Sequence, residues 1–263
     1  MLFPIADENR DRRTTPFVNY TLIAINVLVF VFLQGLGSND RFTYAYSTVP
    51  AEIKEGRDIV TPNRVLEHPV TGQLVEIPGL QPTLIPVYLT LITSMFMHGG
   101  IAHLLGNMLF LWIFGDNVED RLGHARYIIF YLLCGVLASL AHVFTTVAFS
   151  ASEATLLIPS LGASGAISAV LGGYLLLFPS RRVTVIISWF VTEVPAFIAI
   201  GMWFVFQIIS GLGMLGSGSQ AGGVAYAAHI GGFVAGLGLI KIFAIGRPAT
   251  GEYRPRHGYH EER

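Results

Sequence analysis

The feature that most constrains this chain is a series of long apolar runs separated by polar segments. A helix needs about 20 mostly apolar residues to cross the hydrocarbon core of a bilayer. Six runs approach that length, at residues 17–36, 88–114, 125–148, 160–178, 194–213 and 224–245. The chain is 52% hydrophobic and 13% charged over 263 residues, whereas soluble domains carry about 25% charged residues. The sequence therefore predicts an all-α membrane protein, a single domain over residues 1–263 with six transmembrane helices.

Two run boundaries need an argument. The first run, 17–36, is too long for the apolar part of a signal peptide and lacks a clear cleavage site, so we expect a retained helix. The fifth run is expected to begin at Val194, because Glu193 then lies beside the positive end of the helix dipole and Pro195 in the first turn. Residues 183–192 then become an interfacial connector.

Positive charge predicts how the bundle is oriented. Four of the sixteen Lys and Arg residues lie in the loop 37–86, and long loops contribute little to orientation. The other twelve fall in the termini and in loops on the same side, at positions 10, 12, 13, 121, 126, 181, 182, 241, 247, 254, 256 and 263. We therefore expect the segments 1–16 and 246–263 to be cytoplasmic and the long loop 37–86 to be extracytoplasmic. In a bacterium the protein would lie in the plasma (inner) membrane.

Two polar residues enter the membrane from the extracytoplasmic side. Ser164 follows Gly162 and Ala163 at the start of the fourth run, and His229 lies near the start of the sixth. Each is about five residues into its run, which predicts a common depth of roughly 7 Å. A serine among small residues usually serves helix packing, but an intramembrane histidine is functional by default. Together they favour a hydrolase in which Ser164 is the nucleophile and His229 the base.

The second run supplies two further polar side chains. His103 and Asn107 are four residues apart and so share one helix face. Either could simply bond a neighbouring helix, but convergence with the serine and histidine favours donors for an oxyanion.

Carboxylates that could orient the histidine are expected on the wrong side of the membrane. A Ser-His dyad is therefore predicted, with Glu153 or an acidic residue of the long first loop left as the alternative. The excluded carboxylates are Asp116, Glu119, Asp120 and Glu193.

Small residues predict a close approach of the fourth and sixth helices. Gly232 and Gly236 form a GxxxG pattern, and Gly165, Ala169 and Gly172 repeat small residues on the fourth helix. Such faces allow backbones to approach closely, which would bring the serine within reach of the imidazole.

In this ordered set, from about Thr90 to Gly238, the chain resembles the rhomboid family of intramembrane serine proteases. The matching elements are the GxSG at 162–165, the His103 and Asn107 pair, and an Ala-His followed by two glycines at 228–236. The resemblance implies a six-helix rhomboid bundle that cleaves transmembrane protein substrates within the lipid bilayer. It implies that Ser164 is the nucleophile and His229 the general base and acid. His103, Asn107 and the Ser164 backbone N–H would bind the oxyanion, and Gly162 is counted with these binding residues.

Two departures from the family pattern stand out. Many rhomboids carry a Trp-Arg pair shortly before the second helix, where this chain reads Val-Tyr-Leu-Thr-Leu-Ile at 87–92. Some members place an aromatic residue four positions after the nucleophile to stack on the histidine, where this chain has Ser168. Tyr226 is the candidate to orient His229 instead.

Other classes of membrane protein fit the sequence less well. His98 and His103 are five apart with no neighbouring glutamate, so no zinc-protease motif is present, and neither a metal nor a cofactor is expected. None of the runs offers the aspartates of an aspartyl protease, and no inverted repeat indicates a transporter. The remaining alternative is a catalytically silent rhomboid-like protein that binds membrane-protein clients. Such proteins typically lose the serine or the histidine, and this chain keeps both.

Three further properties bear on partners. The net charge of −1 gives no indication of a nucleic-acid partner. Cys134 is the single cysteine, which excludes an intrachain disulfide. The sequence leaves the oligomeric state, the natural client and the cleavage sequence open.

Overall fold

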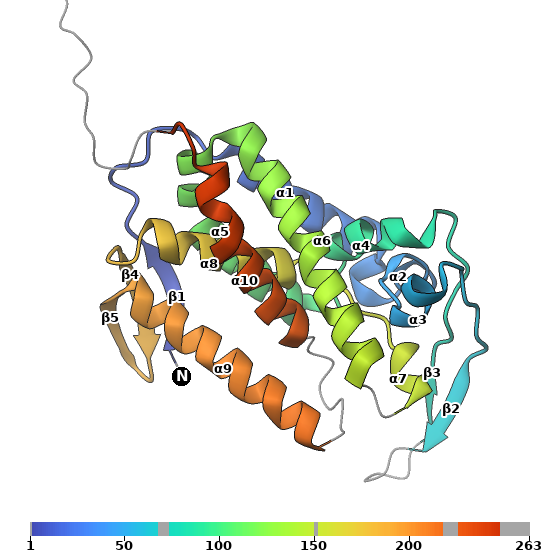
Figure 1. Ribbon diagram of the computed structural model, residues 1–263. Coiled ribbons are helices and arrows are strands. Elements are labelled where there is room, and N and C mark those ends of the chain that lie inside the picture. Colours follow the sequence, from blue (N-terminus) through green and yellow to red (C-terminus); the bar gives the residue numbers. More distant parts are fainter. Residues whose placement is uncertain (1, 68–73, 150–151, 218–225, 248–263) are drawn as a thin grey trace, which may run out of the picture.

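The computed structural model describes residues 2–67, 74–149, 152–217 and 226–247, and six apolar helices form its main body (Figure 1). The described chain is a helical membrane bundle, as the composition predicts. The six helices are α1 (Phe17–Leu28, continued by a π-helical turn at Val29–Leu33), α5 (Ile101–Leu122), α6 (His124–Phe149), α8 (Ser164–Leu177), α9 (Ala196–Ser217) and α10 (Tyr226–Phe243).

These helices differ in length. Four of them, α5, α6, α9 and α10, are long and apolar enough to cross a membrane, judged by length and composition. The other two, Phe17–Leu33 and Ser164–Leu177, are shorter apolar helices. Each of the six runs therefore contains a helix in the predicted order, with two helices below the length of a full span.

The predicted limits 88–114 of the second helix are wrong at both ends. Residues 87–96 instead form three short pieces, the 3-10 turns Val87–Leu89 and Ser94–Phe96 with α4 (Thr90–Thr93) between them. The long helix begins after Gly99 and Gly100 and continues to Leu122. It can include Asp116 and Glu119 because Arg12 pairs with Asp116 and the first turn of α1 donates to Glu119, so neither is buried as an isolated charge.

The all-α prediction also misses two small sheets. Residues 183–192, predicted as a connector, lie in a hairpin of β4 (Arg182–Ile187) and β5 (Phe190–Pro195), and β1 (Leu2–Asp7) pairs with β4. Both pairings are antiparallel, in the order β1-β4-β5. Residues 183–187 are all β-branched, which favours a strand, and burial alternates along it, with Val183 and Val185 buried and Thr184 and Ile186 only partly buried. The fifth helix accordingly begins at Ala196 and not at Val194.

The Gly- and Ser-rich sequence from Gly211 to Gly223 predicts a flexible loop over the outer mouth of the bundle. Its first part is instead helical, because α9 continues to Ser217. Its remainder, 218–223, lies outside the described residues, as does the tail from residue 248.

The long first loop has structure of its own. It contains α2 (Asp40–Tyr46), α3 (Pro50–Glu55) and a hairpin of β2 (Arg64–Glu67) and β3 (Leu74–Ile77), preceded by a 3-10 turn at Gly35–Gly37. Val49, Ala51 and Leu80 form a small separate core within the loop. Thr48 pairs with Ser160, which follows the short helix α7 (Glu153–Leu156), so the loop is fastened next to the start of α8.

The centre of the bundle is α8, whose residues 165–174 are all buried. Its closest partner is α10, and the two backbones touch where glycines meet. A Cβ built on Gly232 would lie 2.1 Å from the carbonyl oxygen of Gly165, and one on Gly236 would lie 2.1 Å from that of Ala169. The predicted close approach of these helices is therefore confirmed.

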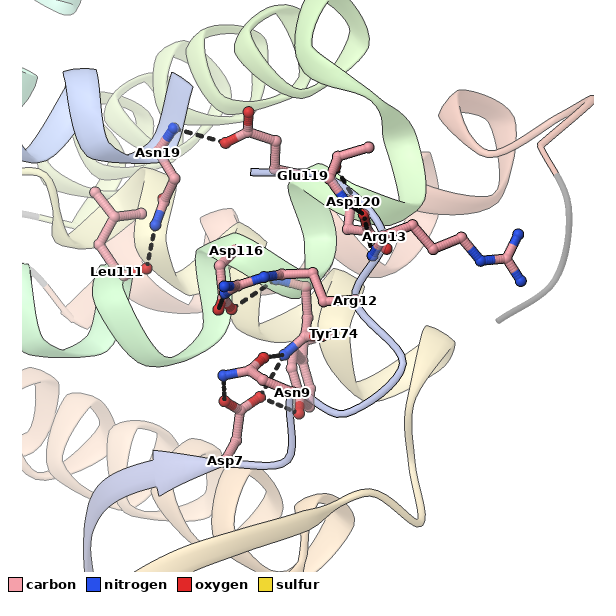
Figure 2. A network of polar contacts seen from close by, with 12 residues as sticks. Asp7, Asn9, Arg12, Arg13, Asn19, Leu111, Asp116, Glu119, Asp120 and Tyr174 are labelled. Atoms are coloured by element: carbon pink, nitrogen blue, oxygen red, sulfur yellow. Dashed lines mark hydrogen bonds and ion pairs between the residues drawn. The ribbon is translucent and has the colours of Figure 1, made fainter. Parts of the chain in front are cut away.

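At the end of the bundle where α8 and α10 finish, a polar network fixes the N-terminal segment (Figure 2). The Asp7 carboxylate accepts hydrogen bonds from the Tyr174 hydroxyl at 2.6 Å and from the Asn117 amide at 2.7 Å. Arg12 forms an ion pair of 2.5 Å with Asp116. The segment 1–16 is thus attached to α5 and α8. Below, this end of the bundle is called the terminal end, and the end that carries the long loop the opposite end.

Candidate active site

Ser164 and His229 meet near the opposite end of the bundle. The His229 Nε2 atom lies 2.8 Å from the Ser164 hydroxyl oxygen, a hydrogen-bond distance. Both residues are partly exposed. His229 is the fourth residue of α10, but Ser164 is the first residue of α8, so the prediction that it lies about five residues inside its helix is wrong. The chain before it is not helical because Gly162 has a φ of +124°, a conformation that favours glycine.

Gln207 on α9 contacts the other side of the imidazole, and the sequence analysis missed this role. Its Oε1 atom lies 2.8 Å from the His229 Nδ1 atom, and the residue is buried. Because an amide oxygen only accepts, Nδ1 must carry the proton in this arrangement. The Nε2 atom is then free to accept the serine proton. The available signal was a single amide in the apolar run 196–209, and such groups seldom enter a membrane without a partner.

His103 and Asn107 lie one turn apart on α5, and His103 is exposed whereas Asn107 is buried. The Gly99 backbone N–H donates to His103 Nδ1 at 3.4 Å, which leaves the proton on Nε2. That part of the ring faces the loop before Ser164, because a Cβ built on Gly162 would lie 2.9 Å from His103 Nε2. Asn107 is buried, and within the described residues its Nδ2 group has no hydrogen-bond partner. Both side chains therefore offer an N–H donor that no group in the described part of the chain accepts.

Gly162 contributes space and not a donor. Its backbone N–H is already bonded to the carbonyl oxygen of Ser94 at 2.8 Å. Its missing side chain leaves room for the His103 ring, since a Cβ would lie 2.8 Å from His103 Cε1. The Ser164 N–H lies in the first turn of α8, where backbone N–H groups lack partners within the helix and the dipole favours negative charge.

With this geometry in place, comparison with known proteins is decisive for the family. The family model described as "Rhomboid domain" matches residues 86–245, more than half of the chain. The chain belongs to the rhomboid family. It is an integral membrane protein of that family, with the fold that its helices and motifs predict.

Several curated rhomboids are similar to this chain. "Rhomboid protein 1, mitochondrial" of Saccharomyces cerevisiae is 32% identical over 60% of this chain and 42% of its own length. "Rhomboid protease GluP" of Bacillus subtilis is 35% identical over 60% of this chain and 27% of its own length. Human "Presenilin-associated rhomboid-like protein, mitochondrial" is 30% identical over 43% of this chain and 31% of its own length. The matched region thus spans less than half the length of each of these relatives.

Around the histidine, this rhomboid differs from members that stack an aromatic residue on the ring. The Ser168 hydroxyl donates to the Ser164 carbonyl oxygen at 2.6 Å and does not reach the imidazole. The ring lies instead between Trp203 and Tyr226, with centroids 6.1 Å and 6.3 Å away. Tyr226, the predicted orienting residue, meets the ring edge-on, whereas Gln207 makes the hydrogen bond.

The four carboxylates that the sequence analysis excluded lie away from Ser164 in the structure. Asp116, Glu119 and Asp120 bond to residues 12–19 at the terminal end, and Glu193 is exposed on β5. Both His229 ring nitrogens are engaged by Ser164 and Gln207. No carboxylate therefore takes the orienting position in this rhomboid.

A small cavity opens beside Ser164. Its walls are mostly small side chains and backbone, contributed by Gly135, Ser139, Ser160, Gly162, Gly165, Ala166 and Ala228, with Ser94, Met95 and Leu161 completing it. A cavity of this kind accommodates only a small side chain. Among the described residues no three His, Cys, Asp or Glu side chains gather in a way that could hold a metal ion.

Proposed function

We propose that this rhomboid is an intramembrane serine endopeptidase that hydrolyses peptide bonds in or near transmembrane helices of membrane proteins. The observation that carries the proposal is the chain of hydrogen bonds from Gln207 through His229 to Ser164. Nucleophilic catalysis by serine needs a base within about 2.6–3.2 Å and a third group that orients the base. This arrangement supplies the nucleophile in Ser164, the base in His229 and the orienting group in Gln207.

The proposed reaction follows from the positions of these atoms. His229 Nε2 takes the Ser164 proton while the serine oxygen attacks the substrate carbonyl carbon. The oxyanion that forms is bound by the free N–H groups of His103, Asn107 and the first turn of α8, each worth on the order of 3 kcal/mol. His229 then gives its proton to the leaving amine. Water, activated by the same imidazole, attacks the acyl-enzyme and releases the second product and the serine.

Client helices are proposed to enter beside α9. Only 22% of the residues in the apolar window of α9 are buried, compared with 56% for α5. Its exposed face is apolar, with Phe197, Val205, Phe206 and Ile209 each more than half exposed. A helix held so loosely can move at small cost. The client must also unwind locally, because helical hydrogen bonds shield its peptide groups.

The topology proposed with this mechanism has both termini in the cytoplasm and the active site opening to the extracytoplasmic side, as the distribution of arginines predicts.

The cavity beside Ser164 supports a preference for a small residue before the cleaved bond. Replacing Gly or Ala near the cleavage site of a client with Leu should slow turnover. Unchanged turnover would contradict both the small cavity and the need for unwinding.

The decisive experiment uses the purified chain with a labelled single-span substrate. Wild type should cleave it, and Ser164→Ala and His229→Ala should reduce cleavage to background. A fluorophosphonate probe should label wild type and not Ser164→Ala, which reports an activated hydroxyl without knowledge of the client. Cleavage that survives Ser164→Ala would eliminate this nucleophile, and absence of both labelling and cleavage would favour a client-binding role.

A further inference from the structure

The three-stranded sheet at the terminal end is divided into a charged end and an apolar end. Asp7, Arg182 and Glu193 lie near the ends of their strands next to the start of α9. At the other end, the register places Phe3 beside Ile186 and Val191, and the turn joins Ile187 to Phe190. All three strands therefore change from charged to apolar in the same direction.

The apolar end is among the most exposed hydrophobic surfaces of the described chain. Trp189 is 94% exposed, Phe190 76% and Val191 64%. Phe3 on the adjoining strand is exposed as well. The turn that presents these side chains contains Ser188 with a φ of +55°, a conformation uncommon outside glycine. An exposed aromatic cluster on a turn with unfavourable backbone geometry points to a partner that covers it.

The position of the hairpin favours lipid as that partner. β5 leads directly into α9, a helix long and apolar enough to cross the membrane, and both strands of the hairpin contact α9. In Figure 1 β1 begins, at its apolar end, on the side of the sheet toward which α9 extends. α9 itself carries an exposed apolar face that begins at Phe197.

We propose that Trp189, Phe190 and Val191, with Phe3, insert into the interfacial layer of the leaflet nearest the chain termini, beside α9. Tryptophan favours this layer because its ring is both apolar and able to donate a hydrogen bond. The insertion is shallow, because β5 is an edge strand and its outer backbone groups need water or headgroups as partners. The charged end carries both signs of charge, so the contact does not depend on anionic lipid.

The insertion is tested by fluorescent labelling of the full chain in phosphatidylcholine nanodiscs, where both faces are accessible. In a Cys134→Ala background, Trp189→Cys is labelled with a polarity-sensitive dye and compared with Glu193→Cys, an exposed position at the charged end of the same hairpin. Iodide quenching should be about fivefold weaker at 189 than at 193, and lipids carrying a quencher near the glycerol should act mainly at 189. Equal iodide quenching at the two positions would overturn the proposal.

A second measurement guards against disturbance by the label. The intrinsic fluorescence of wild type should be quenched more strongly by interfacially brominated lipid than that of Trp189→Phe. Equal quenching of the two proteins would also overturn the proposal. If protection of position 189 from iodide is lost when the protein is diluted in lipid, the surface binds a second copy and not lipid. If that protection appears only when a substrate is added, the surface binds the client. Neither readout depends on proteolytic activity.

Discussion

At the scale of single residues, His229 is held by a hydrogen bond on each side of its ring. Ser164 contacts Nε2 and Gln207 contacts Nδ1, each at 2.8 Å. A neutral amide can fix the tautomer and the plane of the ring as a carboxylate does, without placing a further charge in the membrane. In the proposed reaction Gln207 is therefore a positioning residue, and the effect of replacing it should differ from that of replacing Ser164.

We predict that Gln207→Leu lowers kcat by on the order of a hundredfold with little change in KM, because the base loses its orientation while the substrate site is intact. Gln207→Glu keeps an acceptor for Nδ1 and should retain more activity than the leucine variant. Steady-state kinetics on a single-span substrate measure both. A Gln207→Leu variant with wild-type kcat would show that the hydrogen bond has no part in catalysis.

Gly162 allows a second residue-scale prediction. Gly162→Ala should reduce activity by about a hundredfold, because the new Cβ must displace the His103 ring from its place beside Ser164. The matched control is Gly106→Ala on α5, where a Cβ would meet nothing within 4 Å. Activity of both variants is compared at equal folded concentration. Equal activity of the two variants would remove the steric role assigned to Gly162.

At the scale of elements, the contact between α8 and α10 sets the distance between serine and histidine. Gly165 and Gly232 bring the two helix backbones together one turn or less from the catalytic pair. Between helices in lipid the hydrophobic effect is absent, and close van der Waals packing stabilises the contact instead. Small residues make that close packing possible. The dyad geometry therefore depends on packing well beyond the two side chains.

We predict that Gly236→Ala lowers the free energy of unfolding by about 1–3 kcal/mol, as overpacking does in other cores. Its Cβ would lie 2.1 Å from the Ala169 carbonyl oxygen, so the helices must separate. Gly238→Ala, two residues further along α10 and with nothing within 4 Å, should be neutral or slightly stabilising. Thermal unfolding in detergent compares them, and similar Tm values would contradict the close-contact assignment.

At the scale of the whole molecule, the N-terminal strand joins parts of the chain that are far apart in sequence. β1 pairs with β4 between the fourth and fifth helices, and Asp7 bonds to both Asn117 and Tyr174. Burial raises the pKa of the Asp7 carboxyl to about 7, although hydrogen bonds and Arg181 oppose the shift. The network at the terminal end should therefore respond to pH.

We predict that the Tm of wild type, measured relative to Asp7→Asn, rises as the pH falls from 8 to 5. A carboxyl whose pKa is raised in the folded state contributes most below its unfolded pKa near 4, and that contribution is lost as the pH rises through about 7. The asparagine variant lacks the titrating Asp7 carboxyl but keeps the other ionisable groups, including Glu52. The pH dependence of those groups therefore cancels in the comparison. A Tm difference that grew with rising pH would show that Asp7 is ionised and stabilised in the fold.

The sequence predicted the order of the six helices and the pairing of Ser164 with His229, because these depend on local hydrophobic runs and on chemistry that few residues can perform. It misplaced the start of the second helix at 88 and the helix position of Ser164. Both errors arise from glycines, at 99, 100 and 162, that end or delay a helix inside an apolar run.

What the sequence determined by itself was therefore the membrane bundle and the meeting of Ser164 with His229, since apolar length and rare intramembrane polar groups can be recognised without any knowledge of contacts. Only the tertiary structure decided that Gln207 orients the imidazole, that Asn107 keeps a free donor and that residues 182–195 form a hairpin with β1. These features depend on which distant segments meet, and many partners are compatible with the same local pattern. The packing of α8 against α10 and the attachment of the N-terminal strand select one of them.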